Sequence, residues 1–495
     1  MRLYLINPRN SLISLANVRN NRWNRYRIWK PLGLLVLASA TPPQWDIKVI
    51  DENLGKVDYA LMPQPDLVGI TAFTAQASRA YELATQFRGR SVPVIMGGIH
   101  ATMRTQEALN YVDSVVTGEA ELVWPKVLAD FQNGSLRRVY AGEQVDMKNV
   151  PLARHDLLPK GYAFGSIQIK RGCPLNCNFC SVTAFNGPQY RARPIEDVVR
   201  EFKTIREKLV LVVDDNLIGT SKEHISWAKK LFGAMLAAGI RKKWIAQTTI
   251  NFADDNELLT LASKAGCRGV FIGFESPTAE GLAEVGKKFN LVKNRDLRDS
   301  VRKIRQHNIL VVGSFIIGLD TDKPGIGRQI VEAANFYGID ILNTMVLTPL
   351  PGTRLWEKME SQGRIITNSF PNDWKYYTLT FPVANYKHLS RDDVIREVEY
   401  CDKTFYSIQR ILSRLCGNFW QRYSPLAAMV ANLSYRNNIR IAFKAHRQFN
   451  LSGSQVIKYT SENQIRISYL KEKDALSEKC PAQPITQQKN LFDSK

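Results

Sequence analysis

The sequence predicts an α/β protein made of two successive parallel sheets and a helical C-terminal region. Three observations support this prediction. Short apolar runs alternate with helical stretches over residues 1 to about 130, the alternation resumes six times from Ser166 onward, and the stretch between the two regions has little periodicity. With 495 residues, 44% of them hydrophobic, the chain is long enough for two or three domains and can bury a sizeable core.

The first region, residues 1–135, is expected to form a parallel sheet with helices on both faces. Each apolar run in it ends in small or polar residues, and ligands of open α/β sheets bind at these carboxyl ends of strands. The expected strands are residues 3–6, 47–51, 67–71, 92–96 and 114–116.

Residues 136–164 are expected to be a linker, because this stretch contains Pro151 and Pro159 and lacks a periodic pattern. His155 within it is expected to be a surface or packing residue rather than a ligand. Residues 165–355 then contain six strand–helix units, too few for a closed eightfold barrel, which predicts a partial (β/α)6 TIM-type barrel. Its expected strands are residues 166–169, 209–213, 244–248, 268–274, 309–317 and 341–347.

Residues 356–450 are expected to form a mainly helical extension. A helix should run from Ser390, a good N-cap residue, to about Ser413. The next segment could be a lid, a membrane-surface helix, or a helix packed on the barrel with a basic outer face, and we favour the packed helix. Residues 451–495 are polar and are expected to be a disordered tail.

The formal net charge of +21 is unevenly distributed. No acidic residue precedes Asp46, and none lies between Lys403 and Lys458. Such stretches suit an anionic partner, either a membrane surface, RNA, or an anionic cofactor or substrate, although a soluble basic surface is the simpler interpretation. The sequence has no signal-peptide pattern and no apolar run of about 20 residues. We therefore expect a cytoplasmic protein, peripheral to the inner membrane face at most.

Three cysteines stand close together in the stretch Arg171 to Cys180, which reads RGCPLNCNFC. Three thiolates can hold a 4Fe-4S cluster and leave its fourth iron open to a small molecule, whereas structural zinc normally takes a fourth protein ligand. No histidine is near enough in sequence to supply that ligand. The other four cysteines are scattered, which indicates a reducing compartment rather than a disulfide framework. The expected metal ligands are Cys173, Cys177 and Cys180.

With Phe179 before the last cysteine, this motif resembles that of the radical S-adenosylmethionine (SAM) superfamily. The block in front of it resembles the flavodoxin-like cobalamin-binding domain found in many of these enzymes, through the turns GGIHAT at 97–102 and TGEAE at 117–121. The resemblance covers residues 1 to about 390. It implies three cofactors, namely a 4Fe-4S cluster, S-adenosyl-L-methionine and cobalamin.

One departure concerns the lower face of the cobalt. Methionine-synthase-type domains carry the motif DxHxxG after the first strand, whose histidine binds there, but the loop at residues 8–30 contains no histidine. No histidine of that loop can therefore be a cobalt ligand. Trp23, Tyr26 and Trp29 in the loop could instead shield the metal from water, or could simply be packing residues.

The resemblance also implies which residues meet the cofactors. Asp214, Asp215 and Asn216 replace a GGE-like turn that contacts the SAM amino group, and a buried acidic pair at a strand end favours a functional role. Gly318 belongs to GSFIIGL, whose relatives lie against the adenine, and the turn at 348–353 should lie near the mouth of the barrel. The remaining candidates are Gln247, Glu275 and Ser276 for SAM, and Thr71, Thr74, Gly97, Gly98, His100, Thr102, Gly118 and Glu119 for cobalamin.

The function that the resemblance implies is cleavage of SAM to a 5′-deoxyadenosyl radical, followed by cobalamin-dependent C-methylation of an apolar, lipid-like or tetrapyrrole-like substrate. Relatives methylate hopanoid lipids, tetrapyrroles and antibiotic precursors. An oxidoreductase or cyclase with the same cofactors is the alternative. A third hypothesis, a basic RNA-binding protein with a structural cluster, rests on the charge alone and lacks RNP or KH motifs, so nucleic acid is not an expected partner. The expected partners are the substrate and an electron donor such as flavodoxin or ferredoxin.

Overall fold

The computed structural model describes residues 1–10, 12, 30–287, 289–290, 295–367, 369–420 and 425–447. Residues 1–450 form one compact unit, and residues 451–495 form a second unit that lies wholly outside the described residues. The expected polar tail, and the expected roles of Trp23, Tyr26 and Trp29, therefore fall outside the described residues.

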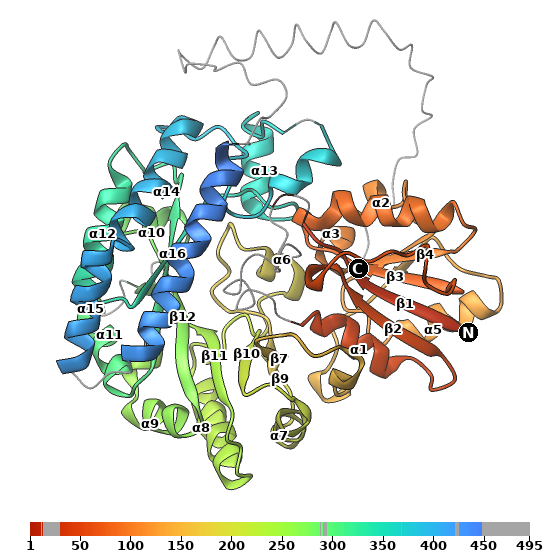
Figure 1. The fold of residues 1–495 in the computed structure, drawn as a ribbon, viewed down its shortest axis with the longest axis horizontal. Helices are drawn as coiled ribbons and strands as arrows, with labels where there is room; N and C mark the ends of the chain where they lie inside the picture. The colour runs from red at the N-terminus through yellow and green to blue at the C-terminus, as the bar shows by residue number, and fades with distance from the viewer. Residues whose placement is uncertain are drawn as a thin grey trace, which may run out of the picture. The chain divides into compact units, whose positions relative to one another are not determined.

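The first six strands form a parallel sheet in the order β2-β1-β3-β4-β5-β6 (Figure 1). This order is flavodoxin-like, as expected, and the direction of winding reverses between β1 and β3. The five expected strands are all present, and a sixth lies in the stretch expected to be a linker. The strands are β1 (Arg2–Asn7), β2 (Asp46–Asp51), β3 (Leu67–Thr71), β4 (Val94–Gly97), β5 (Ser114–Thr117) and β6 (Val139–Ala141).

Helices cover both faces of this sheet, and α1 and α2 lie on opposite sides of it in Figure 1. On one face, α1 and α5 pack against buried strand residues such as Leu3 and Leu67, and the indole Nε1 of Trp124 donates to Thr41 Oγ1 at 2.9 Å. Burial of these apolar side chains holds the layers together. The helices are α1 (Leu32–Ala40), α2 (Ala77–Arg88), α3 (Gly98–Met103), α4 (Thr105–Ala108) and α5 (Trp124–Gln132), with 3-10 turns η3 (Glu52–Leu54) and η4 (Thr74–Gln76).

The second sheet has the order β14-β13-β12-β11-β10-β7 and is also parallel throughout. It confirms the six strand–helix units of a partial barrel, whose edge strands are β7 and β14. Its strands are β7 (Gly165–Ile167), β10 (Leu209–Val212), β11 (Lys243–Thr248), β12 (Cys267–Glu275), β13 (Leu310–Ile317) and β14 (Ile341–Val346).

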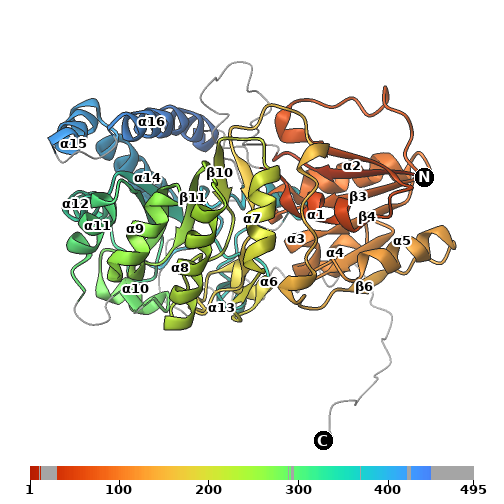
Figure 2. The same cartoon turned by 90° about the horizontal axis from the view of Figure 1, so that it is seen from below.

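The outer face of this sheet is covered by helices α7 to α12 (Figure 2). Their buried side chains and those of the strands form one continuous apolar core. The helices are α7 (Ile195–Thr204), α8 (Lys222–Ala237), α9 (Asn256–Lys264), α10 (Ala279–Glu284), α11 (Leu297–Gln306) and α12 (Ile326–Tyr337), with 3-10 turns η5 (Met147–Asn149) and η6 (His155–Leu157) before β7 and η7 (Ile250–Asp254) after β11. His155, in η6, is a buried packing residue whose Nε2 lies 3.1 Å from Glu201 Oε1.

A small antiparallel pair follows β7 and encloses the cysteine motif. Strands β8 (Lys170–Arg171) and β9 (Arg191–Ala192) pair so that Arg171 lies opposite Arg191. The three cysteines and the short helix α6 (Ser181–Asn186) lie in the loop between these two strands.

The C-terminal region is helical, as expected, but the single helix expected after Ser390 is two helices. Ser390 caps α14 as predicted, since its Oγ accepts from Asp393 N at 3.1 Å. The helix ends where the buried Tyr406 donates through its hydroxyl to Leu342 O at 2.6 Å. The elements are α13 (Arg354–Ser361), η9 (Asn372–Tyr376), α14 (Arg391–Phe405), α15 (Ile408–Trp420) and α16 (Pro425–Arg447).

Helix α16 packs on the barrel, which is the arrangement that we favoured. Its Asn432 Nδ2 donates to Asp340 O at 3.1 Å, just before β14. Among the described residues, no helix is long and apolar enough to cross a membrane.

The segment after the barrel returns to the first sheet. Ser78 Oγ donates to Pro371 O at 2.6 Å, and Trp374 Nε1 donates to Glu107 at 2.7 Å. The Arg104 guanidinium lies 5.4 Å from the centre of the Trp374 ring, a cation–π contact. The segment around Trp374, which follows the barrel in sequence, therefore packs against the first domain.

Candidate functional site

The three motif cysteines lie after the first strand of the barrel and are all free thiols. Cys177 is buried, and Cys173 and Cys180 are half-buried. Burial raises the pKa of each thiol, that of Cys177 to about 12, while the ammonium of Lys287 opposes the rise at all three. A nearby cation thus favours the thiolate form, which is the form that binds metal.

Within the described ranges, no three His, Cys, Asp or Glu side chains converge closely enough to hold a single metal ion. The ligands of a 4Fe-4S cluster do not need to converge in this way, because each thiolate binds a different iron atom.

Acidic residues at the end of β10 hold the backbone that leads into the cysteine loop. Asp214 Oδ1 accepts from Ile169 N at 2.6 Å, and Asp215 Oδ2 accepts from Gly172 N at 2.8 Å and from Asn186 Nδ2 at 2.9 Å. Desolvation raises the pKa of both carboxyl groups. One oxygen of each carboxylate is therefore occupied inside the protein, whereas Asp214 Oδ2 is buried without a hydrogen-bond partner among the described residues.

The neighbouring side chains are also used internally. Asn216 is buried, and its Oδ1 accepts from Gly219 N at 3.2 Å. Gly172 has a φ of +85°, and a Cβ there would lie 1.9 Å from Gln189 O, so the backbone of the cysteine loop requires glycine at this position.

At the end of β12, Glu275 and Lys287 form a buried ion pair with 2.5 Å between Oε1 and Nζ. Burial alone would lower the pKa of Lys287, but Glu275 and the thiol of Cys177 raise it above its usual value. Glu275 adopts a φ of +64°, and its Oε2 is buried without a hydrogen-bond partner in the described part of the chain. A charged pair with one open carboxylate oxygen thus lies beside the cysteines.

Sequence reasoning had selected Glu275 and missed Lys287. Nothing in the sequence distinguishes Lys287 from the lysine that follows it, since only the fold shows that the Lys287 side chain is buried beside Glu275. Ser276, the other predicted residue here, is buried, and its Oγ accepts from Thr278 N at 3.2 Å.

Two further predicted residues lie at the ends of β11 and β13. The Gln247 side chain is exposed, while its backbone oxygen accepts from Leu217 N at 2.9 Å. Gly318 follows β13, and its N–H donates to Asp322 Oδ2 at 2.9 Å, as does that of Leu319 at 3.0 Å. Desolvation raises the pKa of Asp322 to about 7. Asp322, which sequence reasoning missed, thus fixes the turn after Gly318.

The residues predicted to bind cobalamin lie at the carboxyl ends of β3, β4 and β5, but several already have partners. His100 is fully buried, its Nε2 lies 2.9 Å from Tyr81 Oη, and burial lowers its pKa. Gly98 has a φ of +87°, and a Cβ there would lie 2.6 Å from Thr71 Oγ1, so internal packing accounts for this glycine. Thr74 is buried.

The turns after β4 and β5 are joined to each other and to the barrel. Thr102 Oγ1 accepts from Gly118 N at 3.0 Å, which links the GGIHAT turn that starts at Gly97 to the TGEAE turn. Glu119 pairs with Arg171, next to the cysteine loop, at 2.9 Å.

An exposed aromatic residue lies at the same edge of the sheet. The Phe73 side chain follows β3 and is 63% exposed. The crevice between β1 and β3, where the winding reverses, is the usual ligand site of this fold. Sequence reasoning selected Thr71 and Thr74 on either side and missed Phe73, because a single phenylalanine after a strand usually belongs to the core.

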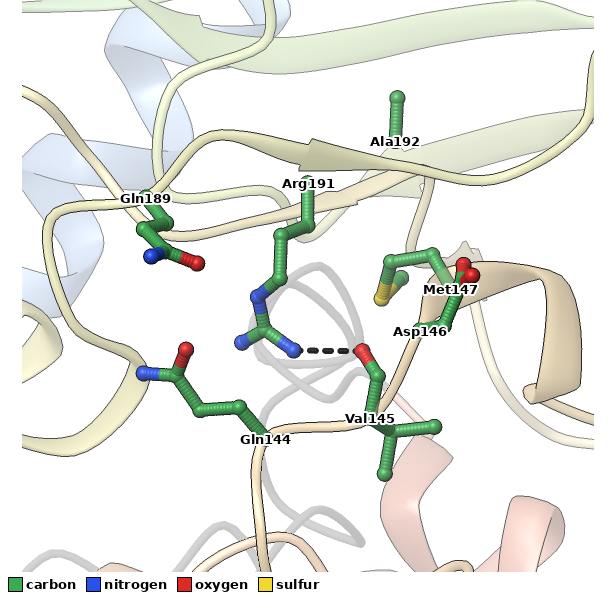
Figure 3. Close-up of a pocket in the computed structure, with 7 residues that line it drawn as sticks. All are labelled: Gln144, Val145, Asp146, Met147, Gln189, Arg191 and Ala192. Atoms are coloured by element: carbon green, nitrogen blue, oxygen red, sulfur yellow. Dashed lines mark hydrogen bonds between the residues drawn. The ribbon is translucent and has the colours of Figure 1, made fainter.

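A cavity of about 400 Å³ lies beside the β8–β9 pair rather than at the ends of the main strands (Figure 3). Figure 3 shows the Arg191 side chain beside Gln144 and Gln189 and pointing toward Val145, where its Nη1 donates to Val145 O at 2.7 Å. None of the predicted cofactor-binding residues lines this cavity, which is bordered by Gln144, Val145, Asp146, Met147, Gln189, Arg191 and Ala192.

Two family models match the chain in the order of its two sheets. The B12 binding domain matches residues 22–128, and the radical SAM superfamily matches residues 167–326. The match to the second model contains the three cysteines and the ends of β10 to β13.

Two curated relatives match most of the chain. An uncharacterized methyltransferase of Synechocystis sp. is 30% identical over 349 residues, which cover 69% of this chain and 65% of the relative. The bacteriochlorophyllide d C-12(1)-methyltransferase of Chlorobaculum tepidum is 27% identical over 406 residues, which cover 78% of this chain and 85% of the relative. The match to the Synechocystis relative thus spans slightly less than two thirds of that relative's length.

A solved structure shares the fold over nearly the whole chain. The radical S-adenosylmethionine methyltransferase TsrM from Kitasatospora setae, with cobalamin and a [4Fe-4S] cluster bound, superposes with a TM-score of 0.64 at 16% identity. The superposition covers 90% of this chain and 99% of that structure. At this identity the likeness concerns the fold alone.

Proposed function

Because this chain belongs to the family of radical SAM proteins that carry a cobalamin-binding domain, we propose that it transfers a methyl group to a carbon atom of an apolar, tetrapyrrole-like or lipid-like substrate. One observation carries the proposal: a flavodoxin-like sheet, whose winding reverses between β1 and β3, precedes a partial barrel whose first loop presents three free thiols. The family's cofactors are a 4Fe-4S cluster, S-adenosyl-L-methionine and cobalamin.

The described residues fit the cluster and SAM. The free thiols of Cys173, Cys177 and Cys180 would hold the cluster, with Lys287 supplying positive charge beside them. SAM carries an ammonium group, for which the buried oxygens Glu275 Oε2 and Asp214 Oδ2, which have no hydrogen-bond partner among the described residues, are suitable acceptors. Buried acceptors without protein partners are costly unless a ligand satisfies them.

The first sheet fits cobalamin through its shape and an apolar contact. Phe73 offers an exposed ring to a flat ligand at the crevice between β1 and β3. His100, the first domain's only histidine, is buried and hydrogen-bonded to Tyr81, so it does not reach that crevice as a metal ligand.

When bound, the cluster and SAM supply radical chemistry and cobalamin supplies the methyl group. The protein's own residues bind, orient and exclude water. Asp214 and Asp215 hold the backbone before the cysteines, and Asp322 holds the turn after β13. This arrangement assigns no acid–base or nucleophilic role to a side chain.

The proposal includes a flavodoxin- or ferredoxin-type electron donor and peripheral contact with the inner face of a membrane. Support for the membrane contact comes from α15, where Ile408 and Leu412 are 56% and 55% exposed, one helical turn apart. Arg410 lies between them in sequence and is also exposed. Exposed apolar and basic side chains together suit an anionic lipid surface.

Isotope labelling tests the reaction. The anaerobically reconstituted protein, with reductant, cobalamin and SAM labelled in its methyl group, is incubated with a bacteriochlorophyllide or with a hopanoid. We expect mass spectrometry to find the labelled methyl group in one of these products, and not with a Cys177→Ala variant. A product that is altered but unlabelled would contradict methylation and favour oxidation or cyclisation.

Replacing Phe73 by alanine tests the cobalamin site. We expect the Kd for hydroxocobalamin to rise about tenfold or more, because loss of a buried phenylalanine contact costs about 1.5–3 kcal/mol. Phe336→Ala is the matched control, since Phe336 lies on α12 and is 61% exposed. Equal affinities for Phe73→Ala and the unaltered protein would refute this placement of the ligand.

A further inference from the structure

We infer that Glu119 is a positioning residue that ties the first sheet to the cysteine loop and thereby holds the loop in the shape that retains the cluster. The inference rests on the proposed binding of a cluster by the three cysteines. It gives Glu119 a role different from direct contact with a cofactor.

Glu119 follows β5 in the first domain and is only 5% exposed. Its Oε2 accepts from Arg171 Nη1 at 2.9 Å, from Arg191 Nη1 at 3.0 Å and from Val145 N at 2.8 Å. Its Oε1 pairs with Arg191 Nη2. Both oxygens are therefore occupied by groups of the protein, which leaves the carboxylate little capacity for a ligand.

The two arginines are a paired feature of the cysteine loop. Arg171 and Arg191 lie directly opposite each other on β8 and β9, the two strands that close the loop around the cysteines. Like charges at opposite positions of a strand pair repel, and burying them without a counter-charge is costly. Glu119 contacts both guanidinium groups, so its charge allows these strands to pair.

The only other anion paired with these arginines among the described residues is Glu121, which pairs with Arg171. Two carboxylates thus balance two guanidinium groups in a nearly buried cluster. Loss of Glu119 would leave two cations with one anion, and Arg191 would lose its ion pair.

The same groups connect to the barrel side of the loop. Arg191 Nη2 donates to Asn186 O at 3.3 Å, and Asn186 Nδ2 donates to Asp215 at 2.9 Å. Asp215 in turn accepts from Gly172 N, directly before Cys173. The base of the cysteine loop is therefore held by Asp215 from the barrel and by Glu119 from the first domain.

A Glu119→Gln substitution tests this role, because it keeps the shape of the side chain and removes its charge. After anaerobic reconstitution, we expect iron loss to a chelator to be about tenfold faster or more, in line with the cost of an unpaired buried charge. We also expect an altered electron paramagnetic resonance signal of the reduced cluster. In the double variant Glu119→Gln/Arg191→Gln, where charge balance returns, slow iron loss should be largely restored.

Glu52→Gln is the matched control. Glu52 is also nearly buried in the first domain and pairs with Arg79 at 2.7 Å, away from the cysteine loop. We expect it to lower the melting temperature without changing iron loss. Equal iron loss in Glu119→Gln and the unaltered protein would overturn the inference, as would equal acceleration by Glu52→Gln.

Two further outcomes are informative. If Glu119→Gln does not fold, Glu121→Gln removes the second anion from the same arginine and should accelerate iron loss to a smaller extent, whereas no acceleration would overturn the inference. If the unaltered protein takes up no cluster, the proposed function fails as well, which distinguishes that result from a failure of the Glu119 role alone.

Discussion

A Cys177→Ala variant is expected to lose the cluster and, with it, all cleavage of SAM. Cys177 is the most buried of the three thiols, and two remaining thiolates cannot replace it within a loop whose base is fixed by Asp215 and Arg171. Iron and sulfide counts after anaerobic reconstitution, together with chromatography of 5′-deoxyadenosine, measure both losses. Stable retention of a full complement of iron by the variant would refute the assignment of the cysteine motif.

Cys267→Ala is the appropriate control for this experiment. Cys267 lies on β12 in the same barrel and is fully buried, and its thiol donates only a weak hydrogen bond to Gly269 O at 3.8 Å. Its removal creates a small cavity but leaves the cysteine loop intact. We therefore expect normal iron content and SAM cleavage in this variant.

The second large effect is expected for Lys287→Met. Methionine removes the ammonium group and leaves the Glu275 carboxylate buried without its partner, an arrangement that typically costs about 3–5 kcal/mol. We expect the free energy of unfolding of the cluster-free protein, measured by anaerobic denaturant titration, to fall by that amount. SAM cleavage should also be lost. Glu275 is one of the groups proposed to bind SAM, and without Lys287 its carboxylate loses the ion pair that holds it in position.

A double variant separates the two consequences. In Lys287→Met/Glu275→Gln the buried charge is gone, so most of the lost stability should return while SAM cleavage remains absent. Lys264→Met, at an exposed position on α9, should change neither quantity. If Lys287→Met were as stable as the unaltered protein, the buried ion pair would not have the importance that its geometry indicates.

Most strands of the two large sheets could be predicted because they contain short, nearly continuous apolar runs, which are characteristic of strands covered on both faces. Strand β6 was not predicted, since Val139–Ala141 is only three residues long and only its central residue is buried. The break between α14 and α15 was also missed. It depends on contacts of Tyr406 with β14, and the apolar pattern alone continues through it.

In the candidate site too, features set by neighbouring residues could be predicted from the sequence, whereas contacts between distant residues could not. The three cysteines could be selected from the sequence because their spacing within ten residues is itself the signal, and their role as cluster ligands stays a prediction. The roles of Lys287 and Glu119 depend on pairing across the fold, and Glu119 and Arg171 are 52 positions apart. A sequence pattern indicates which residues are charged but not which charges meet in the interior.

The return of η9 to the first domain has a consequence for the synthesis of the protein. Trp374, which donates to Glu107 and covers Arg104, is translated 267 positions after Glu107. At about 5–20 residues per second, this partner leaves the ribosome roughly 13–53 s later. During that interval the nascent first domain exposes the surface around Glu107 and Arg104, which the segment after the barrel later covers. The first domain is therefore synthesised first but gains its contacts with Trp374 only late in translation. Exchanging this domain for that of a relative would require exchanging the segment around Trp374 as well.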